Sequence, residues 1–366
     1  MIGKKVLLRV LIAGLLLIPV VGSGPSPASA ADFDQDGYAD LAIGVKWETV
    51  GSQYRAGAVN VLYGTHGGIF AIDDEIWTQD DLIPNGTEAV DYFGEVLAAG
   101  DFDGDGAADL AVGVPYEDVG TVEDAGAVQI LYGSSPGGLV STGTQLWHQN
   151  SSNVGGAAED SDLFGSALAV GDFDGDGYED LAVGVPYETI VDISNAGAVN
   201  VLYGTAGGLT GLGSQLWYEE YNGLGGGVEA GDWFGFALAA GDFDRDGHDD
   251  LAIGIPAEDA GTINDAGRVV TLFGTADGLT ATDYQSWVQG QDGIADPAEE
   301  NDFFGYSLAT GDFDGDDYAD LAIGAPYEDV VLVDRAGRVD VLFGSTGGLV
   351  AVAFQGFTLQ DYAAED

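Results

Sequence analysis

An acidic loop of nine residues returns five times along this chain at an almost constant spacing. Its second copy reads DFDGDGAAD, and successive copies start 69, 71, 70 and 70 residues apart. The five starting positions are Asp32, Asp101, Asp172, Asp242 and Asp312. Self-similarity at a fixed period means that one structural unit is repeated and that each unit contacts mainly its neighbours. The chain is therefore predicted to fold as an array of units of about 70 residues.

An aromatic residue also recurs once in each unit, at a fixed distance from the acidic loop. The positions are Trp77, Trp147, Trp217, Trp287 and Phe357. Such aromatic side chains could be platforms for sugar binding. Recurrence at one point of every unit instead favours a shared role in the core.

Each unit has the pattern of four short strands separated by turn residues. In the second unit they are Phe93 to Gly100, Asp109 to Pro115, Gly126 to Gly133 and Thr144 to Gln149. No segment has a convincing helical period. Four strands per unit, repeated about an axis, predict an all-β fold, a β-propeller. A solenoid is the alternative, but its repeats are generally shorter.

The first unit begins directly at its acidic loop, so its first strand, the innermost one of a blade, is missing. The C-terminal segment FTLQDYAAED stops where the next copy of that strand would begin. We predict that residues after Asp361 do not complete the first blade. This predicts an exposed strand edge that either invites pairing with another chain, because unpaired edges are templates for association, or marks a truncated product.

The acidic loop has the composition of a site for a hard cation. It offers carboxylates at positions 1, 3, 5 and 9, a backbone carbonyl at position 7 and glycine at position 6, which suits Ca²⁺. An EF-hand is excluded because Val112 stands where its glutamate is needed and a strand follows. Mg²⁺ and a metal-free aspartate turn are weaker alternatives.

The spacing predicts up to five calcium ions. The predicted carboxylate ligands are Asp32, Asp34, Asp36 and Asp40; Asp101, Asp103, Asp105 and Asp109; Asp172, Asp174, Asp176 and Asp180; Asp242, Asp244, Asp246 and Asp250; and Asp312, Asp314, Asp316 and Asp320. The predicted carbonyl ligands are Tyr38, Ala107, Tyr178, His248 and Tyr318. The fifth loop departs from the pattern, with Asp317 in place of glycine.

The segment FGSALAVGDFDGDGYEDLAVGVP, Phe164 to Pro186, resembles the FG-GAP repeat of the integrin α-subunit propeller. The resemblance extends over nearly the whole chain after residue 30. It implies a calcium-stabilised extracellular β-propeller, usually of seven blades, that acts in adhesion or ligand binding. Here five repeats are present, and the first has GVKWE where others have GVPYE.

Residues 1–30 have the zones of a secretory signal peptide. Lys4, Lys5 and Arg9 precede an apolar run from Val10 to Val21, and a small-residue cleavage site follows at Ala28 to Ala30. Residues 31–366 are then one propeller domain, secreted or at the cell surface. No later segment is long and apolar enough to predict membrane insertion.

The chain left after cleavage is extremely acidic and has no cysteine. The full chain has 9 Lys and Arg, and three of them lie in the signal peptide. After cleavage 6 basic residues remain against 62 Asp and Glu, which gives a net charge of −56. This charge excludes nucleic acid and anionic membranes as partners. Stability without disulfides must come from packing and metal.

The sequence favours a binding module over an enzyme. His66, His148 and His248 fall at unrelated positions of the repeat, and no catalytic triad context appears. We expect an extracellular protein or glycan ligand, bridged by a cation, on the variable loops opposite the acidic loops. The alternative is an extracellular hydrolase or lyase acting on polysaccharide or phospholipid, or the accessory propeller of such an enzyme.

Overall fold

The computed structural model describes residues 31–70, 74–83, 86–291, 293–330, 333–351 and 356–358. These residues form five antiparallel sheets, one from each sequence repeat. The predicted all-β class is therefore confirmed. The signal peptide, residues 1–30, and the segment after Asp361 lie outside the described residues. Within the described part, no helix is long and apolar enough to cross a membrane.

The strands follow one another as in the repeat pattern. The first sheet contains β1 (Leu41–Gly44), β2 (Val59–Leu62) and β3 (Glu75–Trp77); the second β4 (Val96–Gly100), β5 (Asp109–Val114), β6 (Ala127–Tyr132) and β7 (Val140–Trp147); the third β8 (Ala167–Gly171), β9 (Asp180–Val185), β10 (Ala198–Tyr203) and β11 (Thr210–Trp217); the fourth β12 (Ala237–Gly241), β13 (Asp250–Ile255), β14 (Arg268–Phe273) and β15 (Thr280–Trp287); and the fifth β16 (Ser307–Gly311), β17 (Asp320–Ala325), β18 (Arg338–Leu342) and β19 (Gly356–Thr358). Two short helical turns, α1 (Gln79–Leu82) and η1 (Tyr221–Gly223), lie in the connections.

Within each sheet, sequential strands pair as neighbours. Four sheets have four strands, and the first has three within the described residues, in the order β1-β2-β3. Among the described residues the first blade therefore has no inner strand, as predicted. Strand β19 pairs with β18 in the fifth sheet and does not join the first.

Two predicted strand starts differ from the structure by three residues or more, whereas the other boundaries of the second unit differ by at most two. Strand β4 begins only at Val96: Phe93 forms an isolated bridge with Gly57, and Gly94 lies in a turn with φ of +84°, outside the range of a regular strand. Strand β7 begins at Val140, four residues before the predicted start at Thr144. A register shift between Ile130 and Tyr132 lets this longer strand keep its pairing with β6.

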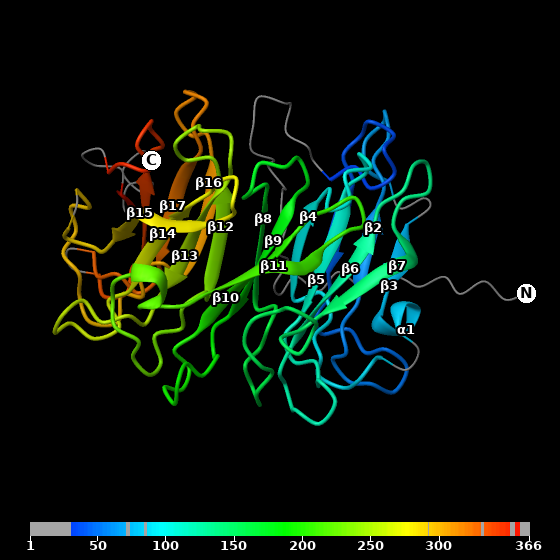
Figure 1. The fold of residues 1–366 in the computed structure, drawn as a ribbon, viewed down its shortest axis with the longest axis horizontal. Coiled ribbons are helices and arrows are strands. Elements are labelled where there is room, and N and C mark those ends of the chain that lie inside the picture. Colours follow the sequence, from blue (N-terminus) through cyan, green and yellow to red (C-terminus); the bar gives the residue numbers. More distant parts are fainter. Residues whose placement is uncertain are drawn as a thin grey trace, which may run out of the picture.

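The five sheets lie side by side in sequence order as propeller blades. Inner strands of successive blades contact each other, β4 with β8, β8 with β12 and β12 with β16. Figure 1 shows the first blade, drawn in blue, and the fifth, drawn in orange and red, at opposite ends of the molecule. The described blades thus form an open row.

The hydrophobic core is divided into four clusters, each between two adjacent blades. One cluster joins Phe173 and Val201 of the third blade to Leu251, Ile253 and Leu279 of the fourth. The other three clusters combine the equivalent residues of the remaining neighbouring blades. Each blade is therefore covered by its neighbours, in line with a repeat architecture.

Close approach of the backbones explains a glycine near the end of the second strand at each described blade boundary. A Cβ at Gly184 would lie 2.2 Å from the Gly235 carbonyl oxygen of the next blade, and one at Gly254 would lie 2.1 Å from that of Gly305. Only glycine allows two blades to meet at this point.

The recurring tryptophans pack against these clusters, which confirms their core role. Trp217 and Trp287 are buried within clusters, and Trp77 and Trp147 pack against them from the side. Phe357, the fifth member, is 42% exposed because no described residue covers that face of the last blade.

Polar contacts also cross each blade boundary, on the edge away from the acidic loops. Gln79 donates from Nε2 to Glu117 Oε2 of the next blade at 2.6 Å, and Gln289 donates likewise to Glu328 at 2.6 Å. Gln149 makes the same bond to Glu188. Burial raises the pKa of Glu188 to about 7, although the Gln149 donor opposes the shift.

The remaining boundary carries a compensated substitution. Glu219 stands at the glutamine position, and Arg268 Nη1 lies 2.9 Å from its Oε1 with both side chains buried. An added buried carboxylate would be costly without a counter-charge, which Arg268 supplies.

Removal of a buried phenylalanine should destabilise the chain far more inside the row than at its end. Phe173 is fully buried, whereas Phe313, at the same position of the fifth repeat, is 51% exposed. We expect Phe173→Ala to lower the free energy of unfolding by about 3–5 kcal/mol. Phe313→Ala should lower it by less than half as much in denaturant titrations of dilute protein. Equal losses would contradict the four-cluster description of the core.

Glu188 should make the protein less stable at alkaline pH when calcium is chelated. Because its folded pKa of about 7 exceeds the ordinary 4.5, its contribution is complete below pH 4.5 and is lost as the pH rises through 7. At pH 8 the free energy of unfolding of Glu188→Gln, measured by urea titration, should therefore exceed that of the parent by about 1–3 kcal/mol. Between pH 5 and pH 8 this free energy should also change less with pH than in the parent. Glu123→Gln, at an exposed position, is the control. An unchanged pH slope in Glu188→Gln would refute the assignment.

Candidate metal centre

In the four blades with four described strands the acidic loop connects the first strand to the second, and in the first blade it leads into β1, which has the place of a second strand, so the loops lie on the same edge of every blade. The loop of the second blade joins β4 to β5, and its last residue, Asp109, begins β5. The turn between β6 and β7 meets the loop there, because Gly133 donates its N–H to Asp109 Oδ1 at 2.8 Å. The loop is thus held between two turns of its own sheet.

Backbone N–H groups arrange the first three carboxylates of each loop. In the second loop, Asp101 accepts from the N–H of Asp105 at 3.1 Å and from that of Gly106 at 2.9 Å. Asp103 accepts from Asp105 N–H at 3.2 Å, and Asp105 accepts from Ala107 N–H at 2.9 Å. These bonds bend the chain so that alternate side chains turn inward, which is the way in which a short loop surrounds a hard cation.

The aspartate at position 9 also accepts structural hydrogen bonds, a role that was not predicted from the sequence. Besides the bond from Gly133, Asp109 accepts from Phe102 N–H at 2.8 Å, and the side chain is fully buried. The same pair of bonds is made by Asp40, Asp180, Asp250 and Asp320. Position 9 therefore fastens the loop to the sheet.

Three carboxylates converge in each of four loops. Oxygens of Asp101, Asp103 and Asp109 lie within 4.8 Å of one another. The same holds for the sets Asp32, Asp34, Asp36; Asp172, Asp174, Asp180; and Asp242, Asp244, Asp246. In the first and fourth loops the third member is position 5, and in the second and third it is position 9. The predicted residues are brought together, and their role as ligands stays a prediction.

The carboxylates of the loops are electrostatically unfavourable as they stand. Burial, followed by the charge of Asp105, raises the pKa of Asp103. Burial also raises the pKa of Asp109, Asp180 and Asp250 to about 8, although backbone donors oppose the shift. A cation among these groups would remove the cost of holding them ionised.

The fifth loop keeps the same backbone despite its substitution. Asp317 adopts φ of +69°, and its N–H donates to Asp312 Oδ2 at 3.1 Å, as the glycine does elsewhere. Aspartate tolerates this left-handed conformation better than most residues. Arg245 of the preceding loop lies 3.0 Å from the Asp317 carboxylate and balances the added charge.

The residues predicted to supply carbonyl ligands at position 7 are each held in place by a backbone hydrogen bond. Their N–H groups donate to the aspartate at position 5, as Tyr178 does to Asp176 at 3.0 Å. The turn therefore fixes position 7, while coordination by its carbonyl stays a prediction. His248 differs from the others in that its Nδ1 lies 3.1 Å from Asp246 Oδ1.

A row of aromatic side chains lies at the opposite edge, and sequence reasoning missed it. Trp233 precedes β12 and is stacked on Phe303 of the next blade, with ring planes 10° apart and centroids 6.3 Å apart. Tyr187 contacts Trp233 at 6.1 Å, and Phe303 contacts Tyr327 at 5.6 Å. Phe236 continues the row, with its ring 5.8 Å from Trp233.

Strained backbone supports this row. Trp233 has φ of +62° and Phe303 of +53°, values that are uncommon for bulky residues. The signal in the sequence was the residue before each Phe-Gly pair, which is Tyr92, Leu163, Trp233 or Phe303. Strain of this kind often accompanies a functional surface.

Comparison with known proteins places these observations in a family. The FG-GAP repeat model matches residues 23–62, 93–131, 164–202, 234–272 and 304–342, more than half of the chain. The chain is 33% identical over 234 residues to integrin alpha-PS2 of Drosophila melanogaster, covering 62% of this chain and 15% of that protein. It is 33% identical over 160 residues to phosphatidylinositol-glycan-specific phospholipase D of Rattus norvegicus, covering 43% of this chain and 18% of that protein.

Among solved structures, the rhamnogalacturonan lyase YesW aligns with a TM-score of 0.43 and 15% identity, over 92% of this chain and 54% of the lyase. Likeness at that level says nothing about activity. The chain spans only about a fifth or less of the length of integrin alpha-PS2 and of the phospholipase D. The repeat matches, the strand order and the acidic loops agree, and the chain belongs to the FG-GAP repeat family, with a propeller similar to that of integrin α subunits.

Proposed function

We propose that this chain is a secreted, calcium-binding propeller that acts as an adhesion or ligand-binding module and not as an enzyme. The observation that carries the proposal is the convergence of three carboxylates within 4.8 Å in loop after loop. Secretion is supported by the signal-like residues 1–30.

The donor set of each loop fits Ca²⁺. All side-chain donors are oxygens, and the backbone bonds already hold the first, third and fifth residues in a turn. Bound Ca²⁺ would supply positive charge that offsets carboxylate repulsion. Because position 9 also fastens the sheet, binding in the loop and stability of the blade are coupled.

The aromatic row supports a ligand-binding role. Trp233, Phe303 and their neighbours come from adjacent blades and lie at the edge opposite the acidic loops. Tyr306 and Tyr327 are 40% and 42% exposed, so part of this surface is open to a partner. Exposed aromatic side chains recognise both glycans and proteins, the two extracellular ligand classes that we propose.

A second candidate is an accessory propeller of an extracellular hydrolase or lyase. It is favoured by the similarity to phosphatidylinositol-glycan-specific phospholipase D over 160 residues. Assays of the purified chain on phospholipids and polysaccharides test whether the chain is itself an enzyme, because turnover by the purified chain would exclude the non-enzymatic proposal. An accessory propeller would instead bind these substrates without turning them over.

Calcium should raise the stability of the chain, and single loops should contribute separately. We expect excess chelator at moderate salt to lower the thermal midpoint markedly. Asp176→Ala should reduce the calcium stoichiometry by about one in isothermal titration, because it removes one ligand of one loop. Asp277→Ala, an exposed aspartate outside the loops, should leave the stoichiometry unchanged. A thermal midpoint that does not change when chelator is added would contradict the calcium proposal.

Loss of the central aromatic ring should weaken ligand binding without affecting calcium. Ligands are first selected by screening the protein against glycan arrays and extracellular proteins, with and without Ca²⁺. Trp233→Ala should reduce the binding of selected ligands about tenfold or more, since central aromatic contacts dominate interfaces. Calcium stoichiometry should match that of the parent. Leu212→Ala, at a 72% exposed position of β11 outside the aromatic row, is the control. Unchanged binding in Trp233→Ala would move the ligand surface elsewhere.

A further inference from the structure

The boundary between neighbouring blades is built in the same way four times. One half is a phenylalanine that follows the first aspartate of the loop, and the other half is a leucine of the next blade. The four phenylalanines, Phe33, Phe102, Phe173 and Phe243, are fully buried. The leucines, Leu139, Leu209, Leu279 and Leu349, are at most 3% exposed.

Backbone hydrogen bonds accompany each contact. The carbonyl of Phe102 accepts from Thr205 N–H at 3.2 Å, and that of Asp101 accepts from Glu179 N–H at 3.1 Å. Equivalent pairs of bonds, between 2.9 and 3.2 Å, occur at the other three boundaries. The apolar contact and the two bonds together define a directional interface, with a different half on each side of the blade.

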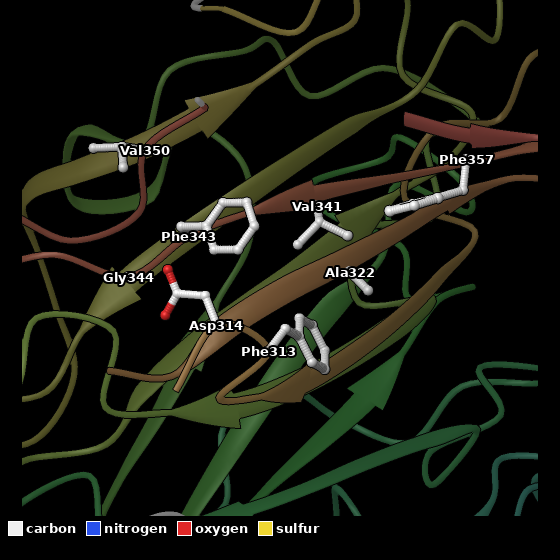
Figure 2. A pocket seen from close by; sticks show the side chains of 8 residues that line it. All are labelled: Phe313, Asp314, Ala322, Val341, Phe343, Gly344, Val350 and Phe357. Carbon is white, nitrogen blue, oxygen red and sulfur yellow. The ribbon is translucent and has the colours of Figure 1, made fainter. Parts of the chain in front are cut away.

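The fifth blade presents the first half without a described partner. Phe313 is 51% exposed, although its four equivalents are fully buried, and Val339 is 41% exposed. Figure 2 shows Phe313, Val341 and Phe343 around a hollow on this face, with Asp314 beside them. The hollow has a volume of about 650 Å³. No described residue donates to the carbonyl of Asp312 or Phe313.

The first blade presents the second half, equally uncovered. Ile69 occupies the leucine position and is 44% exposed. Leu41 and Ile43 are partly exposed, whereas Leu110 and Val112, at the same positions of the second blade, are almost fully buried. The two N–H groups that would complete the interface belong to Ala39 and Thr65, and both residues are exposed.

We propose that two copies of this chain associate head to tail, with the first blade of one copy seated on the fifth blade of the other. Ile69 would enter the space beside Phe313, and the N–H groups of Ala39 and Thr65 would reach the carbonyls of Asp312 and Phe313. The occupant is a second copy because the chain itself repeats this interface four times and carries both missing halves. The two halves lie at opposite ends of the row, so they do not meet within one molecule as described (Figure 1).

Charge and the missing strand set the strength of this association. The first blade has no inner strand in the described residues, so the contact is smaller than the internal ones. Two chains of net charge −56, the value after loss of residues 1–30, also repel each other, and salt screens this over about 8 Å at 0.15 M ionic strength. Association should therefore depend on concentration and strengthen with added salt. An interface of unlike halves either closes into a ring or continues as a filament.

The test uses sedimentation velocity of the purified protein in Ca²⁺ at moderate salt, from about 1 to about 200 μM, since a small contact of this kind gives weak affinity. The parent should form dimers or larger species as the concentration rises. Phe313→Asp and Ile69→Asp should each lose these species, because either change places a charge in an apolar contact. Val191→Asp, at an 82% exposed position on neither face, is the control.

Mixing gives the sharper result. Each charged variant keeps one intact half, so an equimolar mixture of Phe313→Asp and Ile69→Asp should form a dimer that neither forms alone and should grow no further. Circular dichroism and thermal unfolding must show that both variants stay folded. A parent that stays monomeric throughout, or a mixture that stays monomeric while both variants are folded, would overturn the proposal.

Closure within one chain is distinguished by cross-linking. The protein has no cysteine, so Ile69→Cys and Phe313→Cys introduce unique thiols. A short bismaleimide should join the two single variants when they are mixed. A double variant that cross-links mainly within one monomer would show that the first and fifth blades meet in the same chain, which contradicts association between copies.

Discussion

Burial between blades is the interaction on which the rest of this structure depends. A single blade has two apolar faces, and the four clusters of the core all lie between sheets rather than within one. This explains the glycines as well as the large residues. Gly184 allows the backbone of the next blade to approach, and Phe173 fills the space that remains beside it. The repeat thus encodes an interface as much as a sheet.

The acidic loops take part in this packing and are not an addition to it. Asp180 joins its loop to the turn at Gly204, while the neighbouring Phe173 lies in the core between blades. A cation that draws Asp172 and Asp174 together would therefore tighten the segment that positions Phe173. With calcium bound as we propose, the ion, the loop and the blade boundary would form one cooperative unit, and the dense negative charge would be compatible with a compact fold.

Much of this architecture could be predicted from sequence because it repeats. The period of the loops gave the number of blades, and the absence of a strand before Asp32 predicted the incomplete first sheet. The limits arose where tertiary contacts decide. The double hydrogen bonding of Asp109 depends on Gly133, 24 residues away, and periodicity alone cannot show it. The stacking of Trp233 on Phe303 depends on the angle between blades, which the strand pattern does not contain.

The end faces follow from the same repetition. Since each repeat carries one half of the boundary on either side, adding or removing a repeat leaves the same two halves uncovered. Ile69 and Phe313 are exposed for this reason, and not because their local sequences differ in kind from Leu209 or Phe173. Nothing in a single repeat fixes the number of blades, because the Phe–Leu contact and its two backbone hydrogen bonds recur at every described boundary. The second copy that we propose on the two end faces would continue the same contact from one molecule to the next.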